Sequence, residues 1–135
     1  MKKPQQEMFE LEKEEVPTRI FTDGAGARPD GKGSGFAFFR VDTGEKQIIR
    51  EDKLTSNQAE YRGVILALES VNKGALLEIC TDSEIVYAQL NKLYKVRDPK
   101  LVSLWNSVQE IIQRKSLTVT FTWIPRLENL AGKLL

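Results

Sequence analysis

The sequence predicts an α/β protein with a mixed five-stranded sheet and helices on its faces. Three short apolar segments separated by turns come first, which is typical of an antiparallel meander. Two further strand-like segments follow, and helical patterns separate them from the meander and from each other. The predicted order is three strands, a helix, a strand, two helices, a strand and a final helix, and such an order folds as a sheet covered by helices.

The first two strands are expected at residues 18–23 and 34–42, on either side of a connection rich in glycine. The first apolar run ends in one carboxylate, Asp23, and five glycines follow before the second run begins at Phe36. Bare backbone beside an acid at a strand end lets a bulky, charged ligand approach closely. A turn at residues 42–45 leads to a third strand at residues 46–53.

The remaining elements follow from capping residues and periodicity. Thr55, Ser56 and Asn57 can cap a helix, whose apolar spacing covers residues 59–71 and which Gly74 is expected to close. The continuous apolar run at 76–81 is typical of a buried strand, and Asp82 follows it directly. A short helix to about residue 90, an amphipathic helix at 100–115, a strand at 117–124 and a helix from about 129 complete the chain.

Composition restricts the chemistry that this chain can perform. Its 135 residues are 41% hydrophobic, which suits one domain, and we assign residues 18–135 to it and residues 1–17 to a polar tail. The chain has no histidine and a single cysteine, Cys80. Zinc sites of histidine and cysteine and histidine-based triads are therefore excluded, and any metal must be held by oxygen ligands. Oxygen ligands favour magnesium, manganese or calcium.

The charge distribution favours a nucleic-acid partner. The net charge is only +1, but residues 92–135 carry eight Lys or Arg against three Asp or Glu. A basic segment beside an acid-bearing one suits a protein that binds phosphates next to a metal. We find no signal peptide and no apolar run long enough to span a membrane, so we expect a monomeric cytoplasmic protein with no membrane partner.

Three acids stand at special places in the predicted fold. Asp23 ends the first strand, Asp82 ends the fourth, and Glu60 lies in the first turn of the long helix. If the two strands are neighbours, both aspartates project from one edge of the sheet, and a helix packed there brings Glu60 toward them. Clustered carboxylates repel one another unless a cation neutralises them, so this pattern indicates a divalent-metal site.

These residues belong to four sequence blocks that resemble the signature blocks of the type 1 ribonuclease H family, in the same order and at similar intervals. The blocks are Thr22-Asp23-Gly24, Thr55-Ser56-Asn57-Gln58-Ala59-Glu60-Tyr61, Thr81-Asp82-Ser83, and Trp123-Ile124-Pro125-Arg126 with Asn129. The resemblance runs from about Arg19 to the end of the chain. It implies the ribonuclease H fold and a hydrolase: an endonuclease that cuts the RNA strand of RNA/DNA hybrids with Mg²⁺, for which Mn²⁺ can substitute.

The resemblance also implies roles for individual residues. Asp23, Glu60 and Asp82 would bind two metal ions, with Gly24 beside them, and the product would carry a 5′ phosphate. The backbone of Gly24 and Ala25 and the side chains of Asn57 and Gln58 would line the minor groove, where RNA differs from DNA by its 2′-hydroxyl. Lys95 and Arg97 are candidates to hold phosphates of the DNA strand, together with Arg126 and Asn129 at the substrate.

The chain departs from the family pattern at its last residues. Members usually carry a fourth acid shortly after the asparagine that matches Asn129, but here Gly132 or Lys133 stands at that place. Glu128 or Asn129 could take over, or the native chain could continue past Leu135. Two alternatives therefore remain beside the active enzyme: a weakly active or inactive hybrid-binding module, and a DNA-processing nuclease of the same fold.

Overall fold

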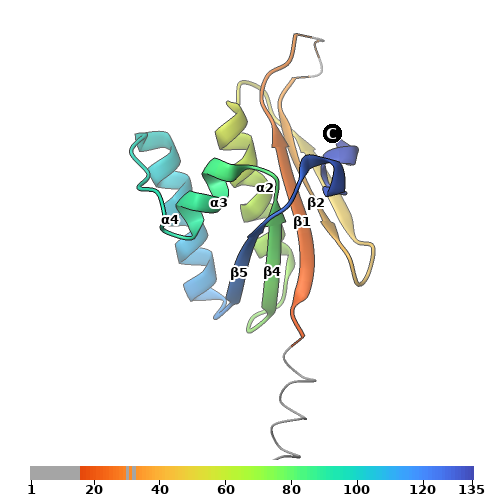
Figure 1. The fold of residues 1–135 in the computed structure, drawn as a ribbon, viewed down its shortest axis with the longest axis vertical. Coiled ribbons are helices and arrows are strands. Elements are labelled where there is room, and N and C mark those ends of the chain that lie inside the picture. The colour runs from red at the N-terminus through yellow and green to blue at the C-terminus, as the bar shows by residue number, and fades with distance from the viewer. Residues whose placement is uncertain (1–15, 30, 32) are drawn as a thin grey trace, which may run out of the picture.

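The computed structural model describes residues 16–29, 31 and 33–135, which form a five-stranded mixed sheet (Figure 1). The strand order is β3-β2-β1-β4-β5, with antiparallel pairing of β1 to β2 and of β2 to β3, and parallel pairing of β1 to β4 and of β4 to β5. The strands are β1 (Thr18–Ala25), β2 (Gly35–Arg40), β3 (Lys46–Arg50), β4 (Leu76–Thr81) and β5 (Thr118–Trp123). The predicted fold class is confirmed.

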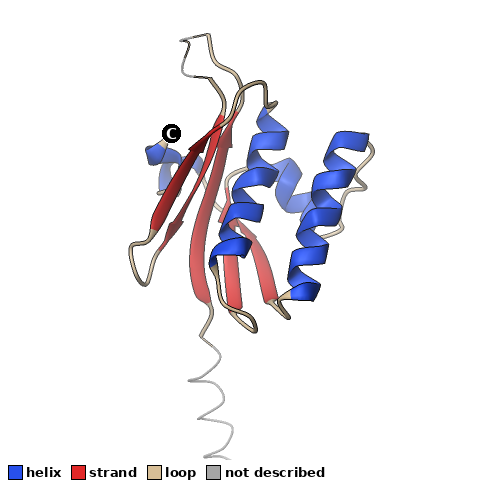
Figure 2. Cartoon of the chain, turned by 180° about the vertical axis from the view of Figure 1, so that it is seen from behind, coloured by secondary structure: helices blue, strands red, loops and turns tan. Residues whose placement is uncertain are grey.

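Helices cover one face of this sheet. Helices α2 (Ser56–Ser70) and α4 (Pro99–Arg114) pack side by side on that face, and α3 (Glu84–Leu90) joins β4 to α4 (Figure 2). The main core lies between the sheet and these helices. It includes Ile20, Phe38, Tyr61 and Leu77, all with no exposed surface. This burial is the main source of stability, because apolar area removed from water stabilises by roughly 25 cal/mol per Å².

The chain ends on the opposite face of the sheet (Figure 1), and a smaller apolar cluster joins the sheet to this C-terminal segment. Phe21 and Cys80 from two neighbouring strands contact Ile124 and Ala131 from the C-terminal segment. Cys80 is a free, fully buried thiol, and burial raises its pKa, so it behaves as a small core residue. This cluster fastens the segment after β5 across the carboxyl end of β1.

Helix α2 differs from its predicted bounds at both ends. It begins at Ser56 because Thr55 and Gln58 form a capping box, in which the Thr55 Oγ1 accepts from the Gln58 N–H and the Gln58 side chain accepts from the Thr55 N–H. It ends at Ser70, before Gly74, which instead adopts φ +82° in the following turn. The Lys115 ammonium donates to the carbonyls of residues 68, 69 and 71, so a distant side chain caps this helix.

The predicted helix from residue 129 is replaced by two short 3₁₀ turns. These are η1 (Arg126–Glu128) and η2 (Gly132–Leu134), separated by residues 129–131, of which Asn129 is extended with φ −81° and ψ 101°. The Asn129 side chain is committed to tertiary hydrogen bonds, described below, and these hold the backbone out of a continuous helix. The prediction of a C-terminal helix was wrong for this reason.

Two further predictions concern the N-terminal tail and membrane-spanning helices. The polar tail was predicted at residues 1–17, of which residues 1–15 lie outside the described residues, while Val16 and Pro17 are exposed. Among the helices that the structure describes, none has the length and apolar character needed to cross a membrane.

Candidate metal centre

The two aspartates reach one edge of the sheet because their strands run parallel as neighbours. In the β1–β4 register, Ile20 lies opposite Ile79 and Phe21 lies opposite Cys80. Asp23 and Asp82 each come two residues after the Phe21–Cys80 pair, so both project from the carboxyl ends of the strands. This is the edge at which ligands of open α/β sheets commonly bind. The condition on which the sequence analysis based the cluster, that these two strands are neighbours, is met.

Glu60 reaches the same edge because helix α2 packs unusually close to β1. A Cβ atom at Gly24 would lie 2.1 Å from the Ala59 carbonyl carbon, and one at Gly63 would lie 2.8 Å from the Asp23 carbonyl oxygen. Atoms cannot approach that closely, so a side chain at either position would force the helix away from the strand. The two glycines therefore permit the close approach of α2 to β1 that brings Glu60 next to Asp23.

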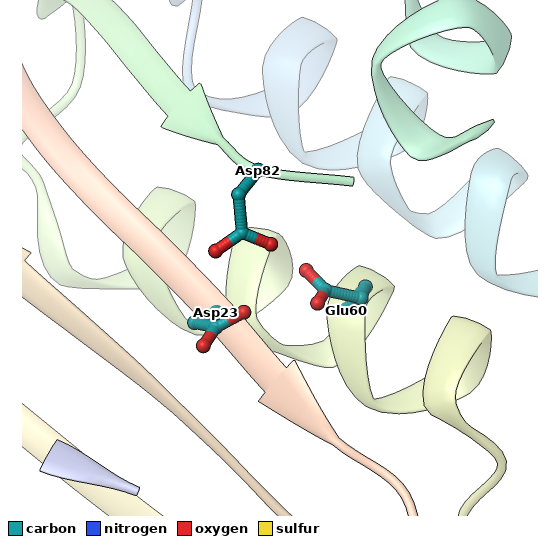
Figure 3. A group of neighbouring side chains, drawn as sticks. All are labelled: Asp23, Glu60 and Asp82. Carbon is teal, nitrogen blue, oxygen red and sulfur yellow. The ribbon is translucent and has the colours of Figure 1, made fainter. Parts of the chain in front are cut away.

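Three carboxylates consequently converge from three elements, as Figure 3 shows. Asp23, Glu60 and Asp82 each offer an oxygen, and these oxygens all lie within 4.8 Å of one another. Glu60 is only 8% exposed, and its Oε2 has no hydrogen-bond partner. Two oxygens bound to one cation are separated by at most twice the metal–oxygen distance. This upper limit is about 4.2 Å for Mg²⁺ and about 5 Å for Ca²⁺. The cluster as it stands has the spacing for a cation of the size of Ca²⁺, and its oxygens must approach one another by up to about 0.6 Å to bind one Mg²⁺ together.

The electrostatics of the cluster agree with this fit. Burial, and then the negative charge of Asp23, raise the pKa of Glu60 to about 10. Burial also raises the pKa of Asp23, and the charge of Asp82 adds to that effect. The metal-free cluster thus retains a proton at neutral pH, and a cation that binds there displaces it.

Asp82 is held in place by the C-terminal segment. The Asn129 side-chain amide donates to Asp82 Oδ2 and to the Thr22 carbonyl, both at 2.9 Å, and the Asn129 Oδ1 accepts from the Ala131 N–H at 3.1 Å. Asn129 is 1% exposed. The sequence analysis placed Asn129 at the substrate; in the structure it lines the cleft beside the acids and is also a buried group that orients a carboxylate. Its spacing from Trp123 gave no signal of this role.

The cluster opens into a cleft of about 530 Å³. Its lining includes Asp23, Glu60, the backbone of Gly24 and Ala25, and the cationic residues Arg126 and Lys133. Arg28 lines it as well, and the sequence analysis did not single out that residue. Gly24, Ala25 and Arg126 thus lie where the sequence analysis expected them, beside the acids.

The other predicted substrate residues lie outside this cleft. Asn57 is half-buried in the first turn of α2, and Gln58 is engaged in the capping box and lines a separate hollow with Arg62 and Lys100. Lys95 and Arg97 are exposed on the connection between α3 and α4. Lys95 lines another hollow beside Trp105. A ligand long enough to touch all these positions must therefore extend well beyond the acid cluster.

The fourth acid that the resemblance led us to expect has no counterpart among the described residues at this edge. Glu128 is exposed, does not line the cleft, and interacts electrostatically with Arg19. Asn129 is committed to its own hydrogen bonds. Gly132 and Lys133 line the cleft but carry no carboxylate.

The sheet topology and the carboxylate cluster define the class: an α/β domain with a divalent-cation site at the carboxyl ends of its central strands. The family model described as RNase H matches residues 15–129. The chain belongs to the RNase H family.

Known proteins of this family are similar over most of the chain. The ribonuclease H of Hyphomonas neptunium is 30% identical over 117 residues, which cover 78% of this chain and 77% of that protein. The bifunctional protein Rv2228c of Mycobacterium tuberculosis is 28% identical over 113 residues. That match covers 78% of this chain but only 30% of the mycobacterial protein, so the chain spans less than a third of that relative.

Solved structures agree with the family assignment. LC11-RNase H1, crystallised in complex with an RNA/DNA hybrid, is 27% identical with a TM-score of 0.75, over 87% of this chain and 92% of that one. RNase H1 of the archaeon Halobacterium salinarum is 24% identical with a TM-score of 0.76, over 89% and 94% of the two chains, and supports the fold alone.

Proposed function

We propose that this protein is a metal-dependent endoribonuclease that hydrolyses the RNA strand of RNA/DNA hybrids. The observation that carries the proposal is the cluster of Asp23, Glu60 and Asp82, whose oxygens lie within 4.8 Å and include a buried, unpartnered Glu60 Oε2. Membership of the RNase H family and the similarity to a structure with a bound hybrid support the choice of substrate. Mg²⁺ is the proposed metal and Mn²⁺ its substitute, because all three ligands are hard oxygen donors.

Each residue of the site would have a distinct part in the reaction. Divalent cations bound at such a site lower the pKa of a water molecule and stabilise the charge that develops on the leaving oxygen. Asp23 and Glu60 would hold the cation at the floor of the cleft, and Asn129 keeps Asp82 turned toward it. Water adds to the phosphorus, the bond to the 3′ oxygen breaks, and the products are a 3′ hydroxyl and a 5′ phosphate.

The walls of the cleft would recognise the RNA strand. Gly24 and Ala25 expose backbone beside the acids, where a bulky side chain would block a nucleic-acid backbone. We propose that this surface meets the minor groove, where 2′-hydroxyls distinguish RNA from DNA. Lys95 and Arg97, exposed on the connection between α3 and α4, would hold phosphates farther along the duplex.

The test is a cleavage assay on an end-labelled RNA/DNA hybrid with Mg²⁺ or Mn²⁺. Asp82→Asn is a matched control, because an asparagine oxygen can still accept the Asn129 hydrogen bond while the carboxylate charge is lost. We expect wild-type cleavage and a loss greater than about 100-fold in the variant. Absence of cleavage by the wild type in both metals contradicts the proposal. Cutting of single-stranded or branched DNA but not of the hybrid would instead identify a DNA-processing nuclease.

A second function, hybrid binding with little or no cleavage, is favoured by one observation. Gly132 and Lys133 occupy the place where the resemblance leads us to expect a fourth acid, and neither side chain can bind a metal. Gel-shift binding of the hybrid, measured beside the cleavage assay, separates the two functions. Binding without cleavage in either metal would establish the second. The monomeric state and the cytoplasmic location expected from the sequence stay predictions.

A further inference from the structure

The backbone of the C-terminal turn η2 lies very close to the acid cluster. A Cβ atom at Gly132 would lie 2.8 Å from Asp23 Oδ2, closer than side-chain carbons come to other atoms. Residue 132 therefore approaches this oxygen only because it is a glycine. The chain then continues into Lys133, whose side chain lines the same cleft as Asp23 and Glu60.

The oxygen ligands all come from the three elements that carry the acid cluster. Within the described ranges, Asp23, Glu60 and Asp82 form the group of acids close enough to share a cation. Asn129 turns its amide nitrogen, not its oxygen, toward Asp82, while its Oδ1 accepts from the Ala131 N–H. The segment from residue 126 to 133 instead contributes positive charge to the cleft through Arg126 and Lys133.

This arrangement suits one cation far better than two. A second divalent cation beside Asp23 would have few protein oxygens to bind and would be repelled by Arg28, Arg126 and Lys133, which line the same cleft. The phosphate of a nucleic-acid strand, by contrast, is attracted by those side chains.

We propose that the acid cluster binds a single divalent cation and that the Lys133 ammonium contacts a substrate phosphate in place of a second cation. The proposal rests on the proposed function, since it assumes a nucleic-acid phosphate in this cleft. A positively charged side chain would thus act at the place where the family resemblance led us to expect a negatively charged one.

The first half is tested by calorimetric titration of the 135-residue chain with Mn²⁺ in the absence of substrate. We expect one site in the wild type and one site of unchanged affinity in Lys133→Met, because lysine is not a ligand. Lys133→Asp should bind a second equivalent, since it restores a carboxylate to the cleft. Two sites in the wild type, or a single site in Lys133→Asp, would overturn this half. Lys133 is exposed, so both variants should fold, which circular dichroism verifies.

The second half is tested by hybrid binding in Ca²⁺, followed by fluorescence anisotropy at several salt concentrations. Lys133→Met should weaken binding about 3- to 10-fold and reduce the slope of log affinity against log salt by about 0.9, the value for one lost phosphate contact. Lys46→Met, on β3 and away from the cleft, is the matched control and should change neither. An unchanged slope in Lys133→Met would refute the phosphate contact. A wild type that neither binds nor cuts the hybrid would refute the proposed function itself, whatever the number of metal sites.

Discussion

Replacing Glu60 by glutamine should make the metal-free protein more stable at alkaline pH while it impairs metal binding. Glu60 is 8% exposed, its Oε2 has no hydrogen-bond partner, and two aspartates lie within 4.8 Å. Burial raises its pKa from 4.5 to about 10, so between these values the folded state holds a proton that the unfolded state has released. The stability that this proton provides is complete below pH 4.5 and is lost progressively as the pH rises toward 10.

The magnitude follows from the size of the shift. Each pH unit in this window lowers the free energy of unfolding by about 1.4 kcal/mol. At pH 8 the buried Glu60 carboxyl group therefore lowers the stability by at most about 5 kcal/mol relative to its value below pH 4.5. Water in the cleft screens part of this cost, and we expect a gain of about 2–5 kcal/mol in Glu60→Gln. For a domain of this size, that gain corresponds to roughly 3–5 °C in melting temperature per kcal/mol.

The assay is urea denaturation of wild type and Glu60→Gln in EDTA at pH 4, 6 and 8. The variant should match the wild type at pH 4 and exceed it increasingly at pH 6 and 8, and Glu45→Gln, an exposed turn residue, serves as the control. Mg²⁺ should stabilise the wild type, by about 2.7 kcal/mol at 100 times its dissociation constant, and the variant much less. Equal stability of the two proteins at pH 8 in EDTA would refute the reasoning.

Three further predictions concern the contacts that build the site. Lys115→Met should lower the free energy of unfolding by about 1–2 kcal/mol, because three carbonyls at the end of α2 lose a charged donor; urea denaturation beside an exposed control, Lys73→Met, measures this. Gly63→Ala should cost about 1–3 kcal/mol and reduce hybrid cleavage, since its Cβ would lie 2.8 Å from the Asp23 carbonyl oxygen; full activity would show that α2 has room to shift. Asn129→Ala should weaken Mn²⁺ binding about 10- to 100-fold, because Asp82 loses the donor that orients it; unchanged calorimetric affinity would contradict that role.

Local chemistry allowed much of the fold to be predicted from the sequence. The bounds of β4 and the cap of α3 at Ser83 depend on neighbouring residues, namely a continuous apolar run and a hydroxyl before a helical pattern. The three acids were found because the predicted bounds place each at the end of a strand or at the start of a helix; in the structure β1 runs two residues past Asp23 and α2 begins four residues before Glu60. Parallel neighbours then bring Asp23 and Asp82 to one edge, as the pairing of Phe21 with Cys80 shows.

Contacts between residues far apart in the sequence decided those features of the fold and of the site that could not be predicted. Lys115 caps a helix that ends at residue 70, and Asn129 reaches Thr22 across 107 positions of sequence, which prevents a C-terminal helix. The glycines at 24 and 63 set the distance between α2 and β1, a quantity that no local pattern contains. The sequence alone thus determined the metal-binding chemistry, because it supplies three carboxylates at element ends and no histidine. Only the tertiary structure showed that Gly132 and Lys133 both line the cleft beside them, because that neighbourhood depends on how the last turn packs against β1.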